Sequence, residues 1–177
     1  CCRGGKIGMV ERVLITTALE DTWREYDTPV LFLGEWCKLY SSKDKWSKFD
    51  SMIVPYHWDD RTKLYEDYLY LKKFQEAVLK EIGLKLNDLH DTKKGEKYWE
   101  ILIAPWLNHF IQIIFDRWVM VNFALKNHDI SEANILIVDE SDTISFDYAD
   151  FCIRANTDLW NGVIYGEILR ELGSVPI

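Results

Sequence analysis

Three short aliphatic runs near the start of the chain each end in a polar cluster, and this pattern restricts the fold more than any other feature. The runs are Val13–Ile15, Val30–Leu33 and Met52–Val54. Strands of an open parallel sheet are buried on both faces and are therefore apolar throughout, and ligands bind beyond their carboxyl ends. The pattern predicts an α/β, Rossmann-like fold with a mainly parallel sheet and a binding site at its carboxyl edge.

The later sequence predicts a long helical hairpin and one more βα pair. Apolar residues recur at three- and four-residue steps from Asp60 to His90, which is typical of a long helix. A second helix is expected over Glu96–Lys126, kinked or broken at Pro105. Because the connection between these helices is short, we expect an antiparallel pair inserted into the α/β order. A strand over residues 134–138 and a helix over residues 155–172 should follow.

Two shorter helices are expected between the first strands. Thr17 and Glu20 have the spacing of a capping box, in which the two side chains satisfy free amides at a helix start. This spacing predicts a helix over Ala18–Arg24. The segment Lys38–Phe49 is expected to form the other helix, which leads into the third strand.

The length of the chain allows one sizeable core. With 177 residues we predict a single α/β domain over residues 9–177, forming part of a longer chain. The first residues, Cys1–Gly8, are expected to be disordered or extraneous. The aromatic content of 14% indicates either a thick core or a surface for a sugar or a protein partner, and a homo-oligomer covering that surface stays open.

Charge and cysteine content exclude several classes of function. A net charge of −8 argues against a broad nucleic-acid surface, which needs clustered Lys and Arg. The four Cys form no C-x-x-C pair, so we predict no metal site and no disulfide framework, and we expect Cys37 to be a buried, inert thiol. A cytoplasmic location follows, with peripheral attachment at the inner membrane as an alternative. The apolar stretch Ile101–Leu125 contains Asp116 and Arg117, so no transmembrane segment is predicted.

The densest titratable cluster follows the third aliphatic run. His57 is a candidate general base, because imidazole titrates near neutral pH. Trp58 is expected to stack on a sugar ring, and Arg61 to hold an anionic group. Asp60 has two interpretations, as a ligand-binding or His-orienting carboxylate and as a helix cap.

A second polar segment follows the second aliphatic run. Gly34 permits either a left-handed turn or a close approach of the backbone to a ligand. Glu35 is a candidate catalytic base or acceptor of sugar hydroxyl bonds, with capping of the next helix as the alternative, and Trp36 is expected to stack on a sugar. Thr16 and Thr17 could donate hydroxyls to a phosphate, although both glycine-rich nucleotide fingerprints are absent.

The second long helix carries a polar stripe on an otherwise apolar surface. The stripe contains Asn108, Gln112 and Asp116 at four-residue spacing, with His109 beside them and Arg117 beyond. Buried polar groups need partners, so the stripe is either a hydrogen-bond network that docks the helix on the sheet or the wall of a ligand site.

Several Trp-containing motifs occur in one order along the chain. They are LITTALE at 14–20, FLGEWC at 32–37, VPYHWDDR at 54–61, YWEIL at 98–102, PWL at 105–107 and FDRW at 115–118. Together they resemble the amino-terminal part of a transferase family encoded in bacterial O-antigen and surface-polysaccharide gene clusters. The resemblance covers residues 9 to about 118 well and the rest loosely. Members of that family are much longer, so the chain resembles the first of two Rossmann-like, GT-B-like lobes.

This resemblance implies a cytoplasmic glycosyltransferase of surface-glycan assembly. Its first lobe would bind a sugar or lipid-linked glycan acceptor and no cofactor, while a nucleotide-activated sugar donor would bind mainly to the missing C-terminal lobe. The isolated lobe would then be inactive. A different hypothesis is a noncatalytic binding or scaffolding domain, in which the aromatic clusters form a partner surface and the polar residues at the strand ends only cap helices.

Overall fold

The computed structural model of the chain describes residues 10–23, 28–139, 141, 143–173 and 175–176. The predicted extraneous segment Cys1–Gly8 lies outside these residues, as does Arg24 at the end of the first predicted helix. The chain divides into two compact units, which we call the sheet unit (Cys1–Tyr56 with Arg117–Ile177) and the hairpin unit (His57–Asp116).

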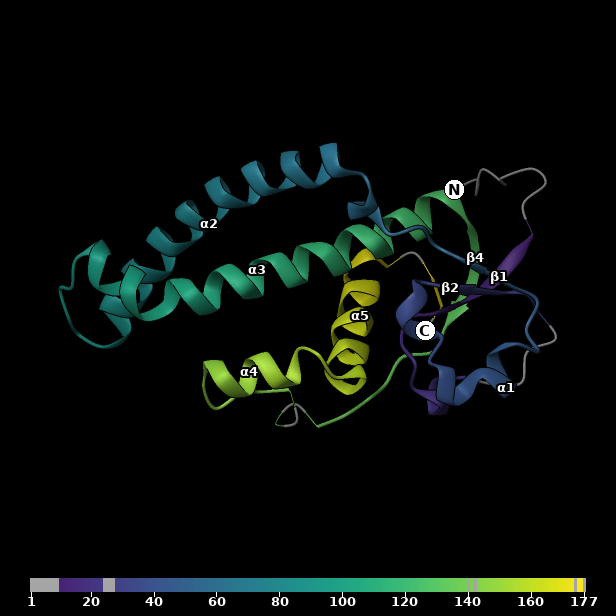
Figure 1. The fold of residues 1–177 in the computed structure, drawn as a ribbon. Coiled ribbons are helices and arrows are strands. Elements are labelled where there is room, and N and C mark those ends of the chain that lie inside the picture. Colours follow the sequence, from purple (N-terminus) through teal and green to yellow (C-terminus); the bar gives the residue numbers. More distant parts are fainter. Residues whose placement is uncertain (1–9, 24–27, 140, 142, 174, 177) are drawn as a thin grey trace. The chain divides into compact units, whose positions relative to one another are not determined.

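The predicted parallel sheet is present in the sheet unit. It consists of β1 (Glu11–Ile15), β2 (Val30–Phe32), β3 (Ser51–Ile53) and β4 (Asp129–Ala133), in the order β3-β2-β1-β4, and every pair is parallel (Figure 1). All residues of β2 are fully buried, as expected of a central strand with both faces covered. The Rossmann-like α/β class is therefore confirmed.

The fourth strand lies five residues before the predicted one. The prediction of a strand over Asn134–Val138 is wrong, because β4 ends at Ala133 and forms the edge of the sheet beside β1. An edge strand can be polar and half-buried, so β4 lacks the unbroken aliphatic pattern of the others. Ile135 of the aliphatic run packs instead on Gly166 of α5 (Asp158–Leu172), where an added Cβ would lie 3.3 Å from the Cβ of Ile135.

The capping box does not form. The predicted helix over Ala18–Arg24 is only a 3-10 turn at Glu20–Thr22. Its acidic side chain is used elsewhere, because the carboxylate of Glu20 accepts hydrogen bonds from Ser42 and Lys45. A long-range contact of this kind replaces the local cap that the spacing suggested.

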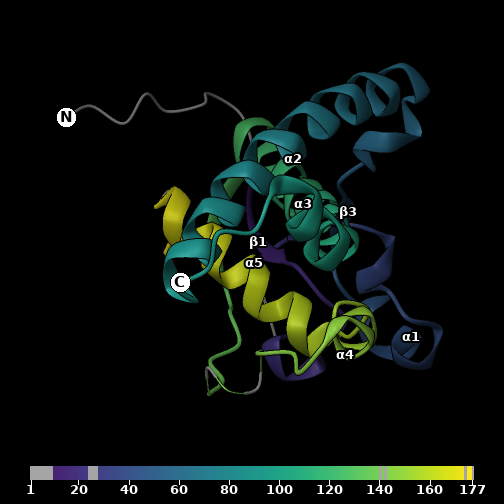
Figure 2. The same ribbon diagram turned by 90° about the vertical axis from the view of Figure 1, so that its left-hand side faces the viewer.

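The remaining helices of the sheet unit are shorter than predicted. Within the predicted helix Lys38–Phe49, only a 3-10 turn at Tyr40–Ser42 and the one-turn helix α1 (Lys43–Trp46) form. The predicted helix over residues 155–172 corresponds to α5, which begins after its N-cap Thr157, and the helix α4 (Tyr148–Arg154) before it was not predicted. Side chains from α5 and from the end of α3 (Glu96–Asn127) join those of the strands in the main core. The ribbons of α5 and β1 are seen together in Figure 2.

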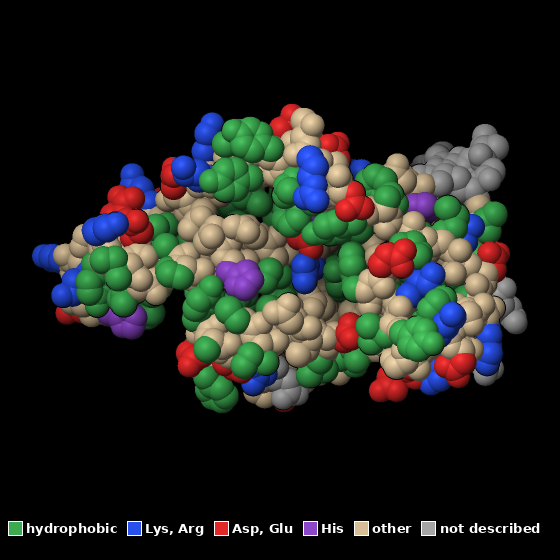
Figure 3. Space-filling model, in the orientation of Figure 1, with side chains coloured by type: hydrophobic (Ala, Val, Ile, Leu, Met, Phe, Trp, Pro, Cys, Tyr) green, Lys and Arg blue, Asp and Glu red, His purple; other side chains and the backbone are tan. Residues whose placement is uncertain are grey.

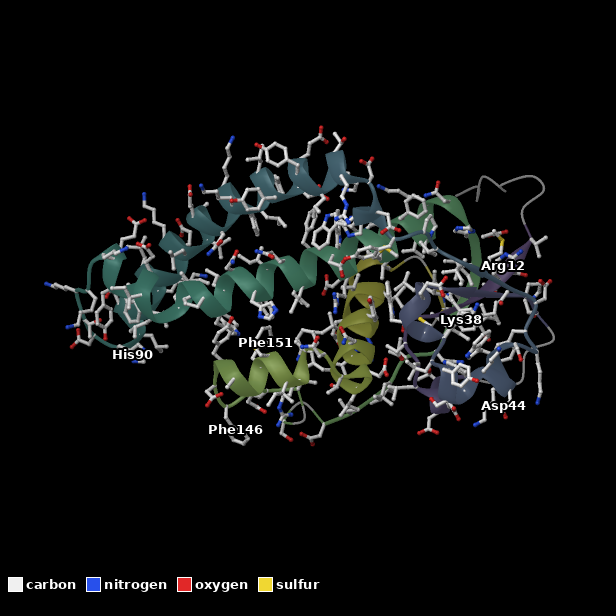
Figure 4. The ribbon with its side chains drawn as sticks, viewed as in Figure 1. Arg12, Lys38, Asp44, His90, Phe146 and Phe151 are labelled. Carbon is white, nitrogen blue, oxygen red and sulfur yellow. The ribbon has the colours of Figure 1, made fainter. Side chains whose placement is uncertain are left out.

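The hairpin unit contains the predicted antiparallel helix pair. Helix α2 (Arg61–Leu89) runs beside the first part of α3, and the turn between them lies near His90 (Figures 1 and 4). Pro105 stands inside α3 without ending it. A small core of Leu71, Leu79, Leu107 and Ile111 joins the two helices. No helix among the described residues is both long and apolar enough to cross a membrane.

Replacing Asp60 by Ala should destabilise the hairpin. Asp60 Oδ1 accepts hydrogen bonds from the amides of Thr62 (2.9 Å) and Lys63 (3.2 Å), so it caps α2. We expect Asp60→Ala to lower the free energy of unfolding by about 1 kcal/mol, measured by urea denaturation. Asp59→Ala removes the adjacent exposed carboxylate and serves as the control. Equal losses in the two variants would contradict the capping role.

Candidate functional site

The carboxyl ends of β1, β2 and β3 converge at one edge of the sheet, as the parallel order requires. The indole N–H of Trp36 donates to the carbonyl oxygen of Thr16 (3.0 Å), and the Trp36 ring meets the ring of Tyr56 edge-on, with centroids 6.3 Å apart. Residues that follow three different strands are therefore in contact. We call Thr16, Thr17, Glu35, Trp36 and Tyr56 the carboxyl rim.

The two threonines form the inner wall of the carboxyl rim. Thr17 is only 1% exposed, and its hydroxyl accepts a long hydrogen bond from the amide of Leu19 (3.4 Å). The carbonyl of Thr17 accepts from the indole of Trp23 (3.1 Å), just as that of Thr16 accepts from Trp36. The threonine backbone thus holds two indoles in place, and a phosphate-binding role of the hydroxyls stays a prediction.

Gly34 is the residue that leaves space for an aromatic ring beside the end of β2. Its φ of −174° is extended, so of the two alternatives that the sequence left open the left-handed turn does not form. A Cβ at this position would lie 2.1 Å from the indole of Trp36, which covers the glycine. In this structure the absence of a side chain at Gly34 allows the indole ring of Trp36 to pack directly on the backbone.

Gly34→Ala should therefore destabilise the sheet unit. The indole cannot move away without losing its hydrogen bond to Thr16, so the added methyl overpacks the site and we expect a loss of about 1–3 kcal/mol in the free energy of unfolding. Gly95→Ala, where an added Cβ meets nothing within 4 Å, is the control in the same urea titration. In a Trp36→Ala background the cost of Gly34→Ala should shrink. An undiminished cost there would contradict the proposed clash.

Glu35 and Cys37 belong to one 3-10 turn but have opposite environments. Glu35 is exposed at the carboxyl rim, where its carboxylate faces solvent. Cys37 is fully buried, with its Sγ 3.5 Å from the carbonyl oxygen of Ile15, and burial raises the pKa of its thiol to about 12. The predicted burial of Cys37 is therefore confirmed, and since the thiolate is the reactive form, its inertness stays a prediction that the raised pKa supports.

Asp158 joins the carboxyl rim from the far end of the chain. It is the first residue of α5, and its Oδ1 accepts a hydrogen bond from the amide of Ala18 (3.2 Å), which follows β1. Asp158 was not predicted as a site residue, because the helix was expected to begin at Ala155. The dipeptide Thr157–Asp158, an N-cap followed by an acidic first turn, was the available signal.

The hairpin unit begins with a buried His–Asp pair. His57 Nε2 lies 3.0 Å from Asp116 Oδ1, and both residues are buried. His57 Nδ1 lies 3.8 Å from Asp67 Oδ2, which accepts hydrogen bonds from the indole of Trp58 (3.0 Å) and from Lys63 Nζ (2.5 Å). We call these five residues the His57 cluster.

Asp67 and Lys63 of this cluster were not singled out in the sequence. They lie four residues apart on α2 and form an ion pair across one turn, so their spacing was the available signal. The rings of His57 and Trp58 pack with centroids 4.6 Å apart. The cluster thus fixes both aromatic rings at the start of the hairpin.

The polar stripe on α3 serves three separate purposes. Asp116 bonds His57, whereas Arg117 Nε donates to Asn161 Oδ1 (3.0 Å) within the sheet unit. Gln112 donates to Asn108 (2.7 Å), and this amide pair lines a hollow in the hairpin unit. The hollow has a volume of about 340 Å³ and is lined by Trp58, Leu64, Tyr68, Leu71, Lys72, Gln75, Asn108 and Gln112. The polar side chains of the stripe therefore form three separate hydrogen-bonded pairs and not one continuous network.

The predicted site residues fall into both units. Thr16, Thr17, Gly34, Glu35 and Trp36 lie in the sheet unit, and His57, Trp58, Asp60 and Arg61 lie in the hairpin unit. Asp60 caps α2, and Arg61 is exposed at its first turn. That Glu35 and His57 serve one reaction stays a prediction. Among the described residues, no three His, Cys, Asp or Glu side chains gather in a group that could hold a metal.

The sequence was compared with known proteins. The model of the LIC12162 family transferase matches residues 12–177, which include β1 from its second residue, the other three strands, both hairpin helices and the carboxyl rim. No curated protein and no solved structure gives a significant match. The match continues well beyond Trp118, where the Trp-containing motifs end. Because it spans nearly the whole sequence, the chain belongs to the LIC12162 family of transferases.

Proposed function

We propose that this transferase is a glycosyltransferase of bacterial surface-polysaccharide or O-antigen assembly. Three observations support the proposal: the transferase family, the motifs that resemble those of surface-polysaccharide clusters, and the polar rim of an all-parallel sheet. Nucleotide-activated sugars are the natural donors for such a reaction. A cytoplasmic enzyme, free or peripheral at the inner membrane, would have access to them.

The carboxyl rim is the proposed acceptor site. Trp36 and Tyr56 provide aromatic surface on which a sugar ring can stack, and the exposed carboxylate of Glu35 can accept a hydrogen bond from a sugar hydroxyl. The observation that carries the proposal is this convergence of residues from three strand ends. A donor held mainly by a further lobe would approach the acceptor there.

Glu35 is the proposed catalytic base. It removes the proton of the acceptor hydroxyl while that oxygen forms a bond to the anomeric carbon of the donor. The bond from the anomeric carbon to the phosphate oxygen breaks, and the nucleoside diphosphate leaves with the electron pair. Glu35 is favoured over His57 because the side chain of His57 is only 3% exposed and its Nε2 is bonded to Asp116.

The test is transfer of a radiolabelled sugar from a panel of nucleotide-activated donors to lipid-linked and free glycan acceptors. A full-length member of the family is assayed, because the chain is expected to be inactive alone. Transfer that depends on Glu35 supports the proposal. Absence of transfer with every donor in the panel would refute it.

A noncatalytic partner-binding role is the second candidate. It is favoured by hydrophobic side chains exposed around α4, of which Phe146 is 92% exposed (Figure 4). In that case variants of Glu35 and of His57 would both retain full turnover in the assay. A surface variant such as Phe146→Ser would instead weaken association, measured as a change in oligomeric state by light scattering.

A further inference from the structure

The hollow in the hairpin unit combines three kinds of side chain that recognise sugars. Trp58 and Tyr68 supply aromatic surface, Gln75, Asn108 and Gln112 supply amides, and the remaining polar residue is Lys72. Aromatic faces stack on the apolar face of a pyranose, and amides both donate to and accept from hydroxyls. A volume of about 340 Å³ is at the lower end of small-molecule sites, which suits one sugar ring.

The positive charge of Lys72 in the lining distinguishes acidic sugars from neutral ones. The chain has a net charge of −8, yet among the described residues lining the hollow the one charged side chain is a lysine. Over the face of α2 seen in Figure 3, Lys and Arg side chains are interspersed with Asp, Glu and hydrophobic ones, so the positive charge is specific to the lining of the hollow. A ligand carboxylate would therefore meet an ammonium group and no acidic neighbour in the lining, which favours an anionic ligand.

Trp58 is held in a fixed orientation at the edge of this hollow. Its N–H donates to Asp67, and its ring packs against His57, which in turn is bonded to Asp116. Elsewhere in the lining the amides of Gln112 and Asn108 are joined by a hydrogen bond, so one oxygen and one NH₂ group of the pair keep capacity for a ligand. Preorganised walls reduce the entropy lost on binding.

We propose that the hollow binds a pyranose that carries a carboxylate, a uronic-acid unit of the glycan. The inference rests on the proposed function, since it names an acidic sugar as the substrate class. It places that sugar on the hairpin unit, whereas the transfer chemistry is assigned to the carboxyl rim. Binding can be measured without turnover, so the two proposals fail independently.

The first experiment compares two tyrosines on the same helix. Tyr68 lines the hollow and Tyr65, one turn earlier, does not, although the two are 54% and 63% exposed. Binding of glucuronate, galacturonate and mannuronate to the full chain is measured by saturation-transfer NMR and calorimetry. Tyr68→Ala should weaken the tightest of these about fivefold or more, and Tyr65→Ala should leave it unchanged. Because both tyrosines are exposed, neither variant should unfold the chain.

The second experiment tests the charge. Glucose, galactose and mannose serve as neutral counterparts of the three uronates. Wild-type protein should bind the uronate more tightly than its neutral counterpart. The Lys72→Met variant should lose this preference and still bind the neutral sugar. The Lys73→Met variant, in which the changed residue lies outside the lining, should keep the preference for the uronate. The proposal is overturned if no uronate binds at concentrations up to about 20 mM, or if Tyr68→Ala and Tyr65→Ala bind equally well.

Discussion

His57→Ala is expected to lower the free energy of unfolding by about 3–5 kcal/mol, the largest stability effect of any single substitution considered for this chain. The substitution leaves the carboxylate of Asp116, which is only 4% exposed, without the imidazole 3.0 Å away. A buried carboxylate that loses a hydrogen-bonding partner is less well compensated for its desolvation. The substitution His57→Ala also removes the imidazole ring that packs against the ring of Trp58. Urea denaturation followed by circular dichroism measures the loss.

The exposed His90 at the end of α2 provides a matched control. His90→Ala removes an imidazole from the surface of the same hairpin, and we expect a change below about 1 kcal/mol. Replacing His57 and Asp116 together by Leu should recover much of the stability, because the buried charge is then removed together with its imidazole partner. If His57→Ala costs no more than His90→Ala, the buried pair is not a structural element of the hairpin.

Glu35→Gln is expected to reduce kcat for sugar transfer by about 10²–10⁴-fold. Glutamine keeps the size of the side chain and can still bond a sugar hydroxyl, but it cannot accept the proton. We therefore expect KM for the acceptor to change little while kcat falls. Because Glu35 is exposed, the variant should fold normally. Initial rates across a range of acceptor concentrations separate the two constants.

The control for this variant lies on α5. Glu171 is an exposed carboxylate about 20 Å along the helix from Asp158, which contacts the carboxyl rim. Glu171→Gln should leave both constants unchanged. An unchanged kcat in Glu35→Gln would reject Glu35 as the base. A large loss on His57→Asn in a variant that remains folded would then assign the proton transfer to the hairpin unit.

Local patterns in the sequence were sufficient for the elements whose stability is local. The aliphatic runs of β1 and β2 are buried on both faces, as the composition of these runs indicated for a parallel sheet, whereas the run of β3 lies at the edge, where Met52 is 46% exposed. The periodicity of α2, with the side chain of Asp60 bonded to its first free amides, specifies a long helix from neighbouring residues. The carboxyl rim followed from these two patterns, because parallel strands end at one edge.

Other features depend on partners that are distant in the sequence, and only the tertiary structure decides them. Ala18 meets Asp158 across 140 residues, and His57 meets Asp116 across 59 residues. Glu20 has the spacing of a cap, but its carboxylate bonds Ser42 and Lys45 instead.

The fourth strand also shows which features local sequence specifies and which depend on distant partners. The sequence by itself indicated that aliphatic residues near Ile135 pack in the interior, and Ile135 does pack on Gly166 of α5, although Ile137 is 82% exposed. Which residues pair with β1 depended on the backbone hydrogen bonds that the edge of the sheet could offer, and these selected the more polar Asp129–Ala133. Burial is encoded by the residue itself, whereas pairing is a property of two segments, so the first can be predicted from a single sequence and the second required the fold.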